Sequence, residues 1–369
     1  MRWFYSFSGL AQRPKARLTV GKGNVGRTVQ ADRQSLSWAI VMTAKEPAAL
    51  VLANVGWHLS LGAREVHVYL DDPLDPVAEP LRRLDRVRVV LCDDAHWQRL
   101  GPDAQHAMQT RRQSLNATEA YKMTEAGWMI HLDADEFLYP QGDMTQIMAD
   151  AYTMGADFLR VRPWERTYVR RNPEGLFEGA FRIPVGGGES ENWRLFGDIS
   201  EFLTKGMTGH AAGKSMVQVG QDLRLGIHTP KKKGVQLEGR PLSDLVLLHF
   251  DGMTPLHWMM KILRYRLVDA GRIHRMLGGH RQAQVLAGVE ACESMTDLLE
   301  FHNLLKFTRR RMRIRLEQTG RYSPMEFEPH EAITKALGYM PDLSVDGFDA
   351  ELRRRHPELL GLLPDRLPA

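Results

Sequence analysis

The sequence predicts an α/β fold with a doubly wound, mostly parallel sheet, and three observations lead to that prediction. Four short, mostly apolar runs have the composition of buried strands, at residues 38–43, 65–70, 87–92 and 128–132. Helical patterns follow the first run and precede the fourth, in the alternation that is typical of parallel sheets. Each run ends in polar or acidic residues, at the strand ends where such folds bind their ligands.

The two helices of this first half have start and stop signals. Lys45-Glu46-Pro47 places a proline near the first turn of a helix that Gly62 ends. Residues 102–126 favour a second helix, which Gly127 stops. Both helices therefore lie between strands, where a crossover between parallel strands requires them.

The second half of the chain is less regular. Short strands are expected at residues 157–162, 215–219 and 245–250, and the segment 163–240 is rich in Gly, Arg and Pro. Thr254 and Pro255 predict the start of a helix that runs to about residue 270. From residue 271 the pattern is helical and amphipathic.

The composition limits the classes of protein to which this chain can belong. The 369 residues are 43% hydrophobic and 25% charged, which is ordinary for a globular protein. Cys92 and Cys292 are too few for a disulfide framework. The start of the chain lacks an apolar signal core, and no run approaches the roughly 18 apolar residues of a membrane span, so a cytoplasmic location is expected.

A strongly basic stretch covers residues 309–315, with Arg309, Arg310, Arg311, Arg313 and Arg315. Two interpretations are open: a solvated helix face, or a peripheral contact with anionic lipid at the inner face of a membrane or with an acidic acceptor. No aromatic residues alternate with the arginines, so nucleic acid is not an expected partner.

Three carboxylates directly follow the apolar run 128–132: Asp133, Asp135 and Glu136. If the chain stays extended, Asp133 and Asp135 point to the same side of it, with Ala134 turned away. Two converging carboxylates can hold a hard cation such as Mg²⁺ or Mn²⁺. The pattern therefore indicates an ion site for a diphosphate; solvated charge or a helix cap is the alternative.

These residues resemble a known family. Val41-Met-Thr-Ala-Lys-Glu46, the pair Trp57-His58, the strand end Asp71-Asp72 and above all His131-Leu-Asp-Ala-Asp-Glu-Phe-Leu138 are similar to the family 2-type glycosyltransferases. The closest likeness is to the branch with a Leu-Asp-Ala-Asp-Glu-Phe motif, which is similar to the family 92 glycosyltransferases. Weaker matches follow at residues 213–215, 227–230 and 248–250, so the resemblance covers roughly residues 36–268. Members commonly have Asn-Glu where this chain has Lys45-Glu46.

The resemblance implies a GT-A fold, a nucleotide-sugar donor with a UDP-sugar favoured, Mn²⁺ or Mg²⁺ as cofactor, and inversion at the anomeric carbon. The acceptor is expected to be a glycan or a lipid-linked sugar. The implied division is an N-terminal extension (1–34), a glycosyltransferase domain (35–270) and a C-terminal helical region (271–369). Within the domain, residues 35–140 form the nucleotide-binding half and residues 141–270 the acceptor half.

Candidate site residues divide by role. The resemblance suggests Asp133, Asp135 and His249 as metal ligands, although His249 could equally be a satisfied core histidine. The nucleotide-sugar is expected to meet Thr43, Glu46, Asp71, Arg111, Asp133 and Lys214; for Asp71 the alternative is a helix cap, and for Lys214 a solvated loop lysine. The general base is sought among Glu201, Asp198 and Asp251, the first two because they lie in the irregular acceptor-side segment. Glu136 either orients the aspartates or begins the next turn.

Three other functions are open. A phosphotransferase would use Asp133 as nucleophile, but such motifs usually follow the first strand of their fold, and three predicted strands precede this one. A nucleotidyltransferase would carry a Gly- and Arg-rich phosphate loop after its first strand, which Thr43-Ala-Lys-Glu-Pro47 is not. A non-catalytic module that binds sugars or membrane surfaces would have little use for both aspartates.

Overall fold

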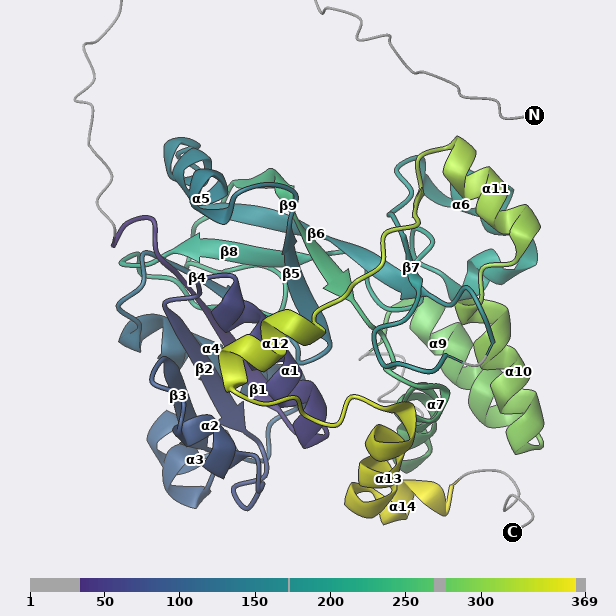
Figure 1. The fold of residues 1–369 in the computed structure, drawn as a ribbon, viewed down its shortest axis with the longest axis horizontal. Coiled ribbons are helices and arrows are strands. Elements are labelled where there is room, and N and C mark those ends of the chain that lie inside the picture. The colour runs from purple at the N-terminus through teal and green to yellow at the C-terminus, as the bar shows by residue number, and fades with distance from the viewer. Residues whose placement is uncertain (1–33, 172, 269–276, 363–369) are drawn as a thin grey trace, which may run out of the picture. The chain divides into compact units, whose positions relative to one another are not determined.

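The computed structural model describes residues 34–171, 173–268 and 277–362 (Figure 1). Residues 31–369 form one compact unit. The predicted N-terminal extension, residues 1–34, lies outside the described residues except for Gln34. Within the described residues, no helix combines the length and the apolar character needed to cross a membrane.

Four parallel strands form one side of the sheet. β1 (Trp38–Ala44) lies between β4 (Trp128–His131) and β2 (Glu65–Leu70), and β3 (Val87–Leu91) pairs with β2. Side chains on both faces of β1, β2 and β4 are buried, which is why the sequences of these strands are mostly apolar. The α/β class and the four strands predicted for the first half are confirmed.

Helices connect these strands. α1 (Ala48–Ser60) begins directly after Pro47, and α4 (Gln109–Met123) ends before Gly127, as predicted. The shorter α2 (Ala78–Arg82) and α3 (Asp94–Leu100) flank β3. The Asp93 carboxylate caps α3 by accepting the backbone N–H of His96.

The sheet continues beyond β4 mainly through antiparallel pairs. β8 (Lys214–Gln218) pairs with β4, and β6 (Phe158–Thr167) pairs with β8 and with β7 (Ala180–Arg182). β5 (Glu136–Pro140) pairs antiparallel with β9 (Gly239–His249), which also runs parallel to β6.

β9 is longer than the strand predicted at residues 245–250. The first half of β9 is mostly exposed and has polar residues, so it carries no apolar signal. The short connecting helices α5 (Met144–Thr153) and α6 (Gly188–Phe196), with the 3₁₀ turn η1 (Gly197–Phe202), complete this half.

The helix predicted after Thr254 is α7 (Pro255–Leu263), continued by the turn η2 (Arg264–Leu267). The Thr254 hydroxyl accepts the backbone N–H of His257 at 3.1 Å, which confirms the predicted cap. α7 lies where its charged residues can meet the acidic turn after β4, as described below.

Residues after 277 do not form a purely helical extension. Helices dominate there, but β10 (Tyr322–Ser323) pairs with β7 in the main sheet. The helices are α9 (Gly279–Leu286), the π turn η3 (Ala287–Ala291), α10 (Met295–Lys306), α11 (Arg310–Gln318), α12 (His330–Leu337), α13 (Val345–Arg355) and α14 (Pro357–Leu360). α12 packs beside α1 (Figure 1), where Gly56 leaves room for Ile333 and Leu337.

The basic stretch belongs to α11. The Leu316 side chain is buried, whereas the five arginines are all exposed: Arg309, Arg310, Arg311, Arg313 and Arg315. Both interpretations given for residues 309–315 are compatible with this arrangement. The peripheral membrane contact therefore stays a prediction.

The pair Trp57-His58 joins α1 to β5. The Trp57 indole donates to the Leu138 carbonyl at 2.7 Å, and the Leu138 N–H donates to His58 Nε2 at 3.1 Å. Because Nε2 accepts, Nδ1 carries the proton and donates to the Asn54 carbonyl at 2.8 Å. Burial lowers the pKa of His58 from 6.5 to about 4, so the neutral ring is the folded form.

We expect the stability of the folded protein to fall at low pH because of His58. Since the folded pKa lies below the unfolded one, the contribution of His58 is complete above about pH 6.5 and is lost as the pH falls toward 4. Thermal unfolding followed between these values should show a falling midpoint, and His58→Gln should flatten that dependence. An unchanged dependence in the variant would assign the acid sensitivity to other buried histidines, such as His302.

Candidate active site

A cavity of about 350 Å³ opens at the carboxyl ends of β1 and β4. The acidic motif forms part of its wall, together with residues from α7 and α9. Four cationic side chains also line it: Lys45, Lys261, Arg264 and Arg281. A cavity that combines carboxylates with several cations suits a highly charged ligand.

The acidic motif is a turn and not an extended strand end. β4 ends at His131 and β5 begins at Glu136, and the Glu136 N–H donates to the Asp133 carbonyl at 3.0 Å. The Glu136 carboxylate in turn accepts the Asp133 N–H at 2.8 Å. The extended backbone expected over these residues is therefore wrong, because this reciprocal pair of bonds closes a tight connection between β4 and β5, although Asp133 and Asp135 both line the cavity.

Lys214 neutralises two of the three carboxylates. Its ammonium lies 2.8 Å from Asp133 Oδ2 and 3.1 Å from Glu136 Oε2, and its side chain is fully buried. Burial opposes the charge on Asp133, but Lys214, His131 and His210 together hold the pKa of Asp133 well below its ordinary value. The predicted contact of Lys214 with a phosphate is not what the structure shows, since the lysine lies beneath the acidic turn.

Both carboxylate oxygens of Asp133 already accept hydrogen bonds. Its Oδ1 accepts from the Gln113 amide at 2.9 Å, while Oδ2 is bound by Lys214. These two partners compete with a cation for Asp133, and its predicted role as a direct metal ligand stays a prediction. Asp135 also has a cationic partner, Lys261 on α7, at 2.6 Å.

His249 ends β9 beside the acidic turn, as the register pairing of Glu136 with His249 requires. Its Nδ1 lies 3.5 Å from Glu165 Oε2. Burial lowers the pKa of His249, but Glu165, Asp135 and Glu136 raise it overall to about 9. Glu165 is itself held by the N–H groups of Thr208 and Gly209, at 2.6 and 2.7 Å.

Asp251 lies in the cavity wall, but both of its carboxylate oxygens contact other side chains. Arg281 contacts its Oδ1 at 3.3 Å, and Oδ2 accepts from Lys306 at 3.2 Å and from Thr208 at 3.0 Å. Burial raises the pKa of Asp251, but Arg281 and Lys306 bring it well below the ordinary value. A carboxylate of such low basicity is a poor general base.

The other two candidate bases lie outside the cavity. Asp198 and Glu201 are on η1 with exposed side chains, and neither lines the cavity. The sequence placed them near the acceptor because they fall in the irregular segment, but their orientation is set by packing of η1 through Ile199. The structure thus does not bring them to the acidic turn.

His280 at the start of α9 has the properties of a base. Its Nε2 lies 2.6 Å from the Gly209 carbonyl, so Nε2 carries the proton and Nδ1 is the acceptor. No described residue binds Nδ1, and the side chain lines the cavity. Burial lowers the pKa of His280, which keeps the ring neutral.

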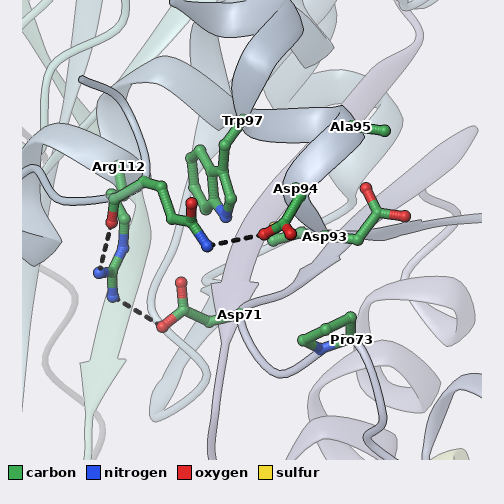
Figure 2. Close-up of a pocket in the computed structure, with 9 residues that line it drawn as sticks. Asp71, Pro73, Asp93, Asp94, Ala95, Trp97 and Arg112 are labelled. Carbon is green, nitrogen blue, oxygen red and sulfur yellow. Dashed lines mark hydrogen bonds and ion pairs between the residues drawn. The ribbon is translucent and has the colours of Figure 1, made fainter. Parts of the chain in front are cut away.

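A second pocket, of about 480 Å³, adjoins the first at the ends of β2 and β3 (Figure 2). The Arg112 guanidinium donates to Asp71 Oδ2 at 2.7 Å, and the Trp97 ring forms one wall. Arg111, which the sequence placed with Arg112 as a candidate to reach a phosphate of the nucleotide-sugar, is exposed and lines neither pocket. α4 turns the side chain of Arg112 inward, and neighbouring residues of a helix cannot share a face.

Consecutive residues of α4 line the two pockets. Gln113 lines the first and Arg112 the second. Between them, Asn116 donates to the Thr43 hydroxyl at 3.0 Å and lies 3.6 Å from the Cys92 sulfur. Thr43 and Glu46 both line the first pocket, as predicted for residues that meet the ligand.

Glu46 is not a free carboxylate. It lies 3.1 Å from His257 Nε2. Burial raises its pKa, but His257, Lys261 and Arg264 lower it to about 2. Glu46 is therefore an ionised acceptor in the cavity wall.

Several residues of the site were not predicted from the sequence: Gln113, Glu165, His210, His280, Arg281 and Lys306. One signal could have found Glu165. The buried positions of β6 alternate from Leu159 through Val161, and Glu165 continues that row as a charged residue on the buried face. The other five lie on helices or loops whose facing residues only the tertiary structure decides.

Comparisons with known proteins add little to this description. No family model matches the sequence, and no curated protein matches it. Among solved structures, the chain is similar to the crystal structure of HddC from Yersinia pseudotuberculosis, with 8% sequence identity and a TM-score of 0.33 over 58% of this chain and 93% of that one. A likeness at this level carries no argument about function.

Proposed function

We propose that this protein is a glycosyltransferase with a GT-A fold that transfers a sugar from a nucleotide-sugar donor. The observation that carries the proposal is the pair of adjoining pockets at the carboxyl ends of the parallel strands, one with an aromatic wall and the other rich in cations. The pocket with the aromatic wall suits a nucleoside, and the cation-rich cavity suits a diphosphate with its sugar. The acidic motif, through which the sequence resembles glycosyltransferases, lies in the wall of the cation-rich cavity.

The nucleoside would occupy the pocket of Figure 2. The Trp97 ring offers an apolar wall for a base. The carboxylates of Asp71 and Asp93 can accept hydrogen bonds from ribose hydroxyls or base N–H groups, and Arg112 holds Asp71 in place. We favour a UDP-sugar, a preference that rests on the resemblance alone.

The diphosphate would lie among Lys45, Lys261, Arg264 and Arg281. Negative charge accumulates on this group as the glycosidic bond breaks, so preorganised cations lower the barrier. A divalent cation, Mn²⁺ or Mg²⁺, would add to this neutralisation when bound. Asp133, Asp135 and His249, the predicted metal ligands, all line the same cavity.

His280 is the residue we propose as general base. An acceptor hydroxyl must lose its proton as it attacks the anomeric carbon, and Nδ1 of His280 is a neutral acceptor in the cavity. The Gly209 carbonyl fixes the tautomer and the ring orientation. The acceptor, a glycan or a lipid-linked sugar, would approach from this side, with inversion as the expected outcome.

The binding step can be tested with the neighbouring arginines. Thermal shift and calorimetry with UDP, GDP, ADP and CDP in the presence of Mn²⁺ should show binding, with UDP strongest. Arg112→Ala should weaken that binding by about tenfold or more, because a hydrogen bond to a charged group contributes roughly 1.5–3 kcal/mol. Arg111→Ala is the matched control and should leave the affinity unchanged.

The product that is released distinguishes a glycosyltransferase from a nucleotidyltransferase. Glycosyl transfer or donor hydrolysis releases a nucleoside diphosphate, whereas a nucleotidyltransferase acting on a nucleoside triphosphate releases pyrophosphate. Binding of UDP without any turnover would favour the non-catalytic module. If none of the nucleotides binds, or if Arg111→Ala is the more damaging change, the proposed nucleoside pocket is wrong.

A further inference from the structure

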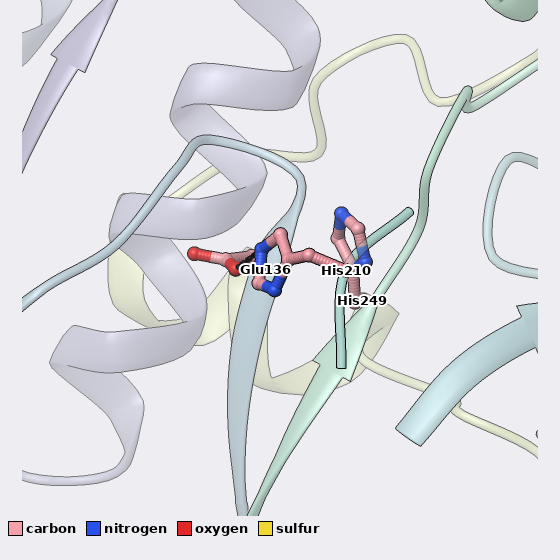
Figure 3. A group of neighbouring side chains, drawn as sticks. All are labelled: Glu136, His210 and His249. Carbon is pink, nitrogen blue, oxygen red and sulfur yellow. Dashed lines mark ion pairs between the residues drawn. The ribbon is translucent and has the colours of Figure 1, made fainter. Parts of the chain in front are cut away.

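Three potential metal ligands from different parts of the chain meet beside the cavity (Figure 3). Glu136 is the first residue of β5 and His249 the last residue of β9, and these two residues are direct partners in the ladder. His210 comes from the loop before β8. One ligand atom of each residue lies within 4.8 Å of the other two.

The ligand atoms of this cluster are buried without hydrogen-bond partners among the described residues. They are Glu136 Oε1, both ring nitrogens of His210, and His249 Nδ1. His210 Nε2 approaches Glu136 Oε1 to 3.3 Å, and His249 Nδ1 approaches Glu165 Oε2 to 3.5 Å, but neither contact has the geometry of a hydrogen bond. Buried polar groups are nearly always satisfied, so several unsatisfied atoms at one point are suited to a shared partner such as an ion or a water.

Surrounding residues hold the three ligands in place. Lys214 and the Asp133 N–H bind Glu136 Oε2 and leave Oε1 free. Gly209 allows the loop to approach His249, because a Cβ at this position would lie 2.5 Å from His249 Cε1. Such outer contacts orient ligands in metal sites.

We propose that Glu136, His210 and His249 bind one transition-metal ion. Two imidazoles and one carboxylate suit Mn²⁺, Fe²⁺, Co²⁺ or Zn²⁺, whereas Mg²⁺ prefers oxygen ligands and keeps several waters. Donor atoms about 2.1 Å from one ion can be at most about 4.2 Å apart, so closing the site needs only small side-chain movements. His210 and His249 line the cavity, and open coordination positions would therefore face the ligand.

This site differs from the one that the sequence predicts. It shares His249 but replaces Asp133 and Asp135 by Glu136 and His210. Both aspartates have lysine partners, and Glu136 shares Lys214 through Oε2, but Glu136 Oε1 and the two ring nitrogens of His210 have no hydrogen-bond partner among the described residues. Metal binding here does not depend on the proposed function and can be measured without any nucleotide.

The test uses the full chain, stripped with a chelator and titrated separately with Mn²⁺, Zn²⁺ and Mg²⁺ in a calorimeter, with bound metal counted by elemental analysis. We expect one equivalent of Mn²⁺ or Zn²⁺ and much weaker binding of Mg²⁺. His210→Asn should weaken binding by more than about tenfold, since even outer-shell changes cost 10–100-fold. His210 has no hydrogen bond to lose, so this variant should keep the unfolding midpoint of the metal-free protein.

His228→Asn is the matched control. The His228 ring lies 4.3 Å from the His210 ring, centroid to centroid, but its Nδ1 binds the Gly213 carbonyl at 2.9 Å. This variant should bind metal like the unmodified protein. The proposal is overturned if the unmodified protein takes up neither Mn²⁺ nor Zn²⁺, or if His210→Asn keeps full affinity. Metal uptake without nucleotide binding would instead count against the glycosyltransferase proposal alone.

Discussion

Replacing Lys306 with methionine is expected to lower the free energy of unfolding by about 3–5 kcal/mol, the cost of removing one partner from a buried ion pair. The Lys306 ammonium lies 3.2 Å from Asp251 and 3.8 Å from Glu165, and all three side chains are buried. Methionine fills a similar volume but leaves two buried carboxylates short of a positive charge. Chemical denaturation followed by circular dichroism would measure the loss.

Two further variants separate charge from packing in this experiment. Lys335→Met makes the same change on the exposed face of α12 and should leave stability nearly unchanged. Combining Lys306→Met with Asp251→Asn should recover part of the lost stability, because an amide needs no counter-charge. A small effect of Lys306→Met would mean that Arg281 and the N–H groups of Thr208 and Gly209 already satisfy both carboxylates.

The second large effect is expected at His280. His280→Ala should reduce turnover by about 10²–10⁴-fold, the usual contribution of a general base. Nucleoside-diphosphate affinity should not change, because Nδ1 is directed to the acceptor and not to the nucleotide. Steady-state rates with a UDP-sugar, compared with calorimetric binding of UDP, would separate the two.

Added imidazole should restore part of the activity of His280→Ala, which a purely structural role of His280 would not allow. The rate of the unmodified protein should also fall at low pH as this ring becomes protonated, and that dependence should disappear in the variant. Asp198→Asn and Glu201→Gln are the controls, since both residues are exposed and outside the cavity. Loss of turnover in either control, with normal rates in His280→Ala, would return the base to the residues first favoured from the sequence.

The sequence alone was sufficient for the first half of the fold. Apolar runs such as 38–43 and 128–132 are long enough and β-forming enough to identify strands, and Pro47 and Gly127 mark helix ends through backbone chemistry that is local to each residue. The position of the acidic motif at a strand end follows from the same local signals. Thr43, Glu46 and Asp71 were placed near the site for that reason, because the carboxyl ends of parallel strands share one edge of the sheet.

Only the tertiary structure decided how the charges pair. The turn between β4 and β5 depends on Glu136, and the partners of the acidic motif come from far along the chain: Lys214 lies 81 residues from Asp133, and Lys261 lies 126 residues from Asp135. Nothing local in a sequence specifies which lysine meets which carboxylate. The pairing of β8 with β4 and the placement of α7 beside the cavity decide it, because each buried charge requires a partner at hydrogen-bond distance.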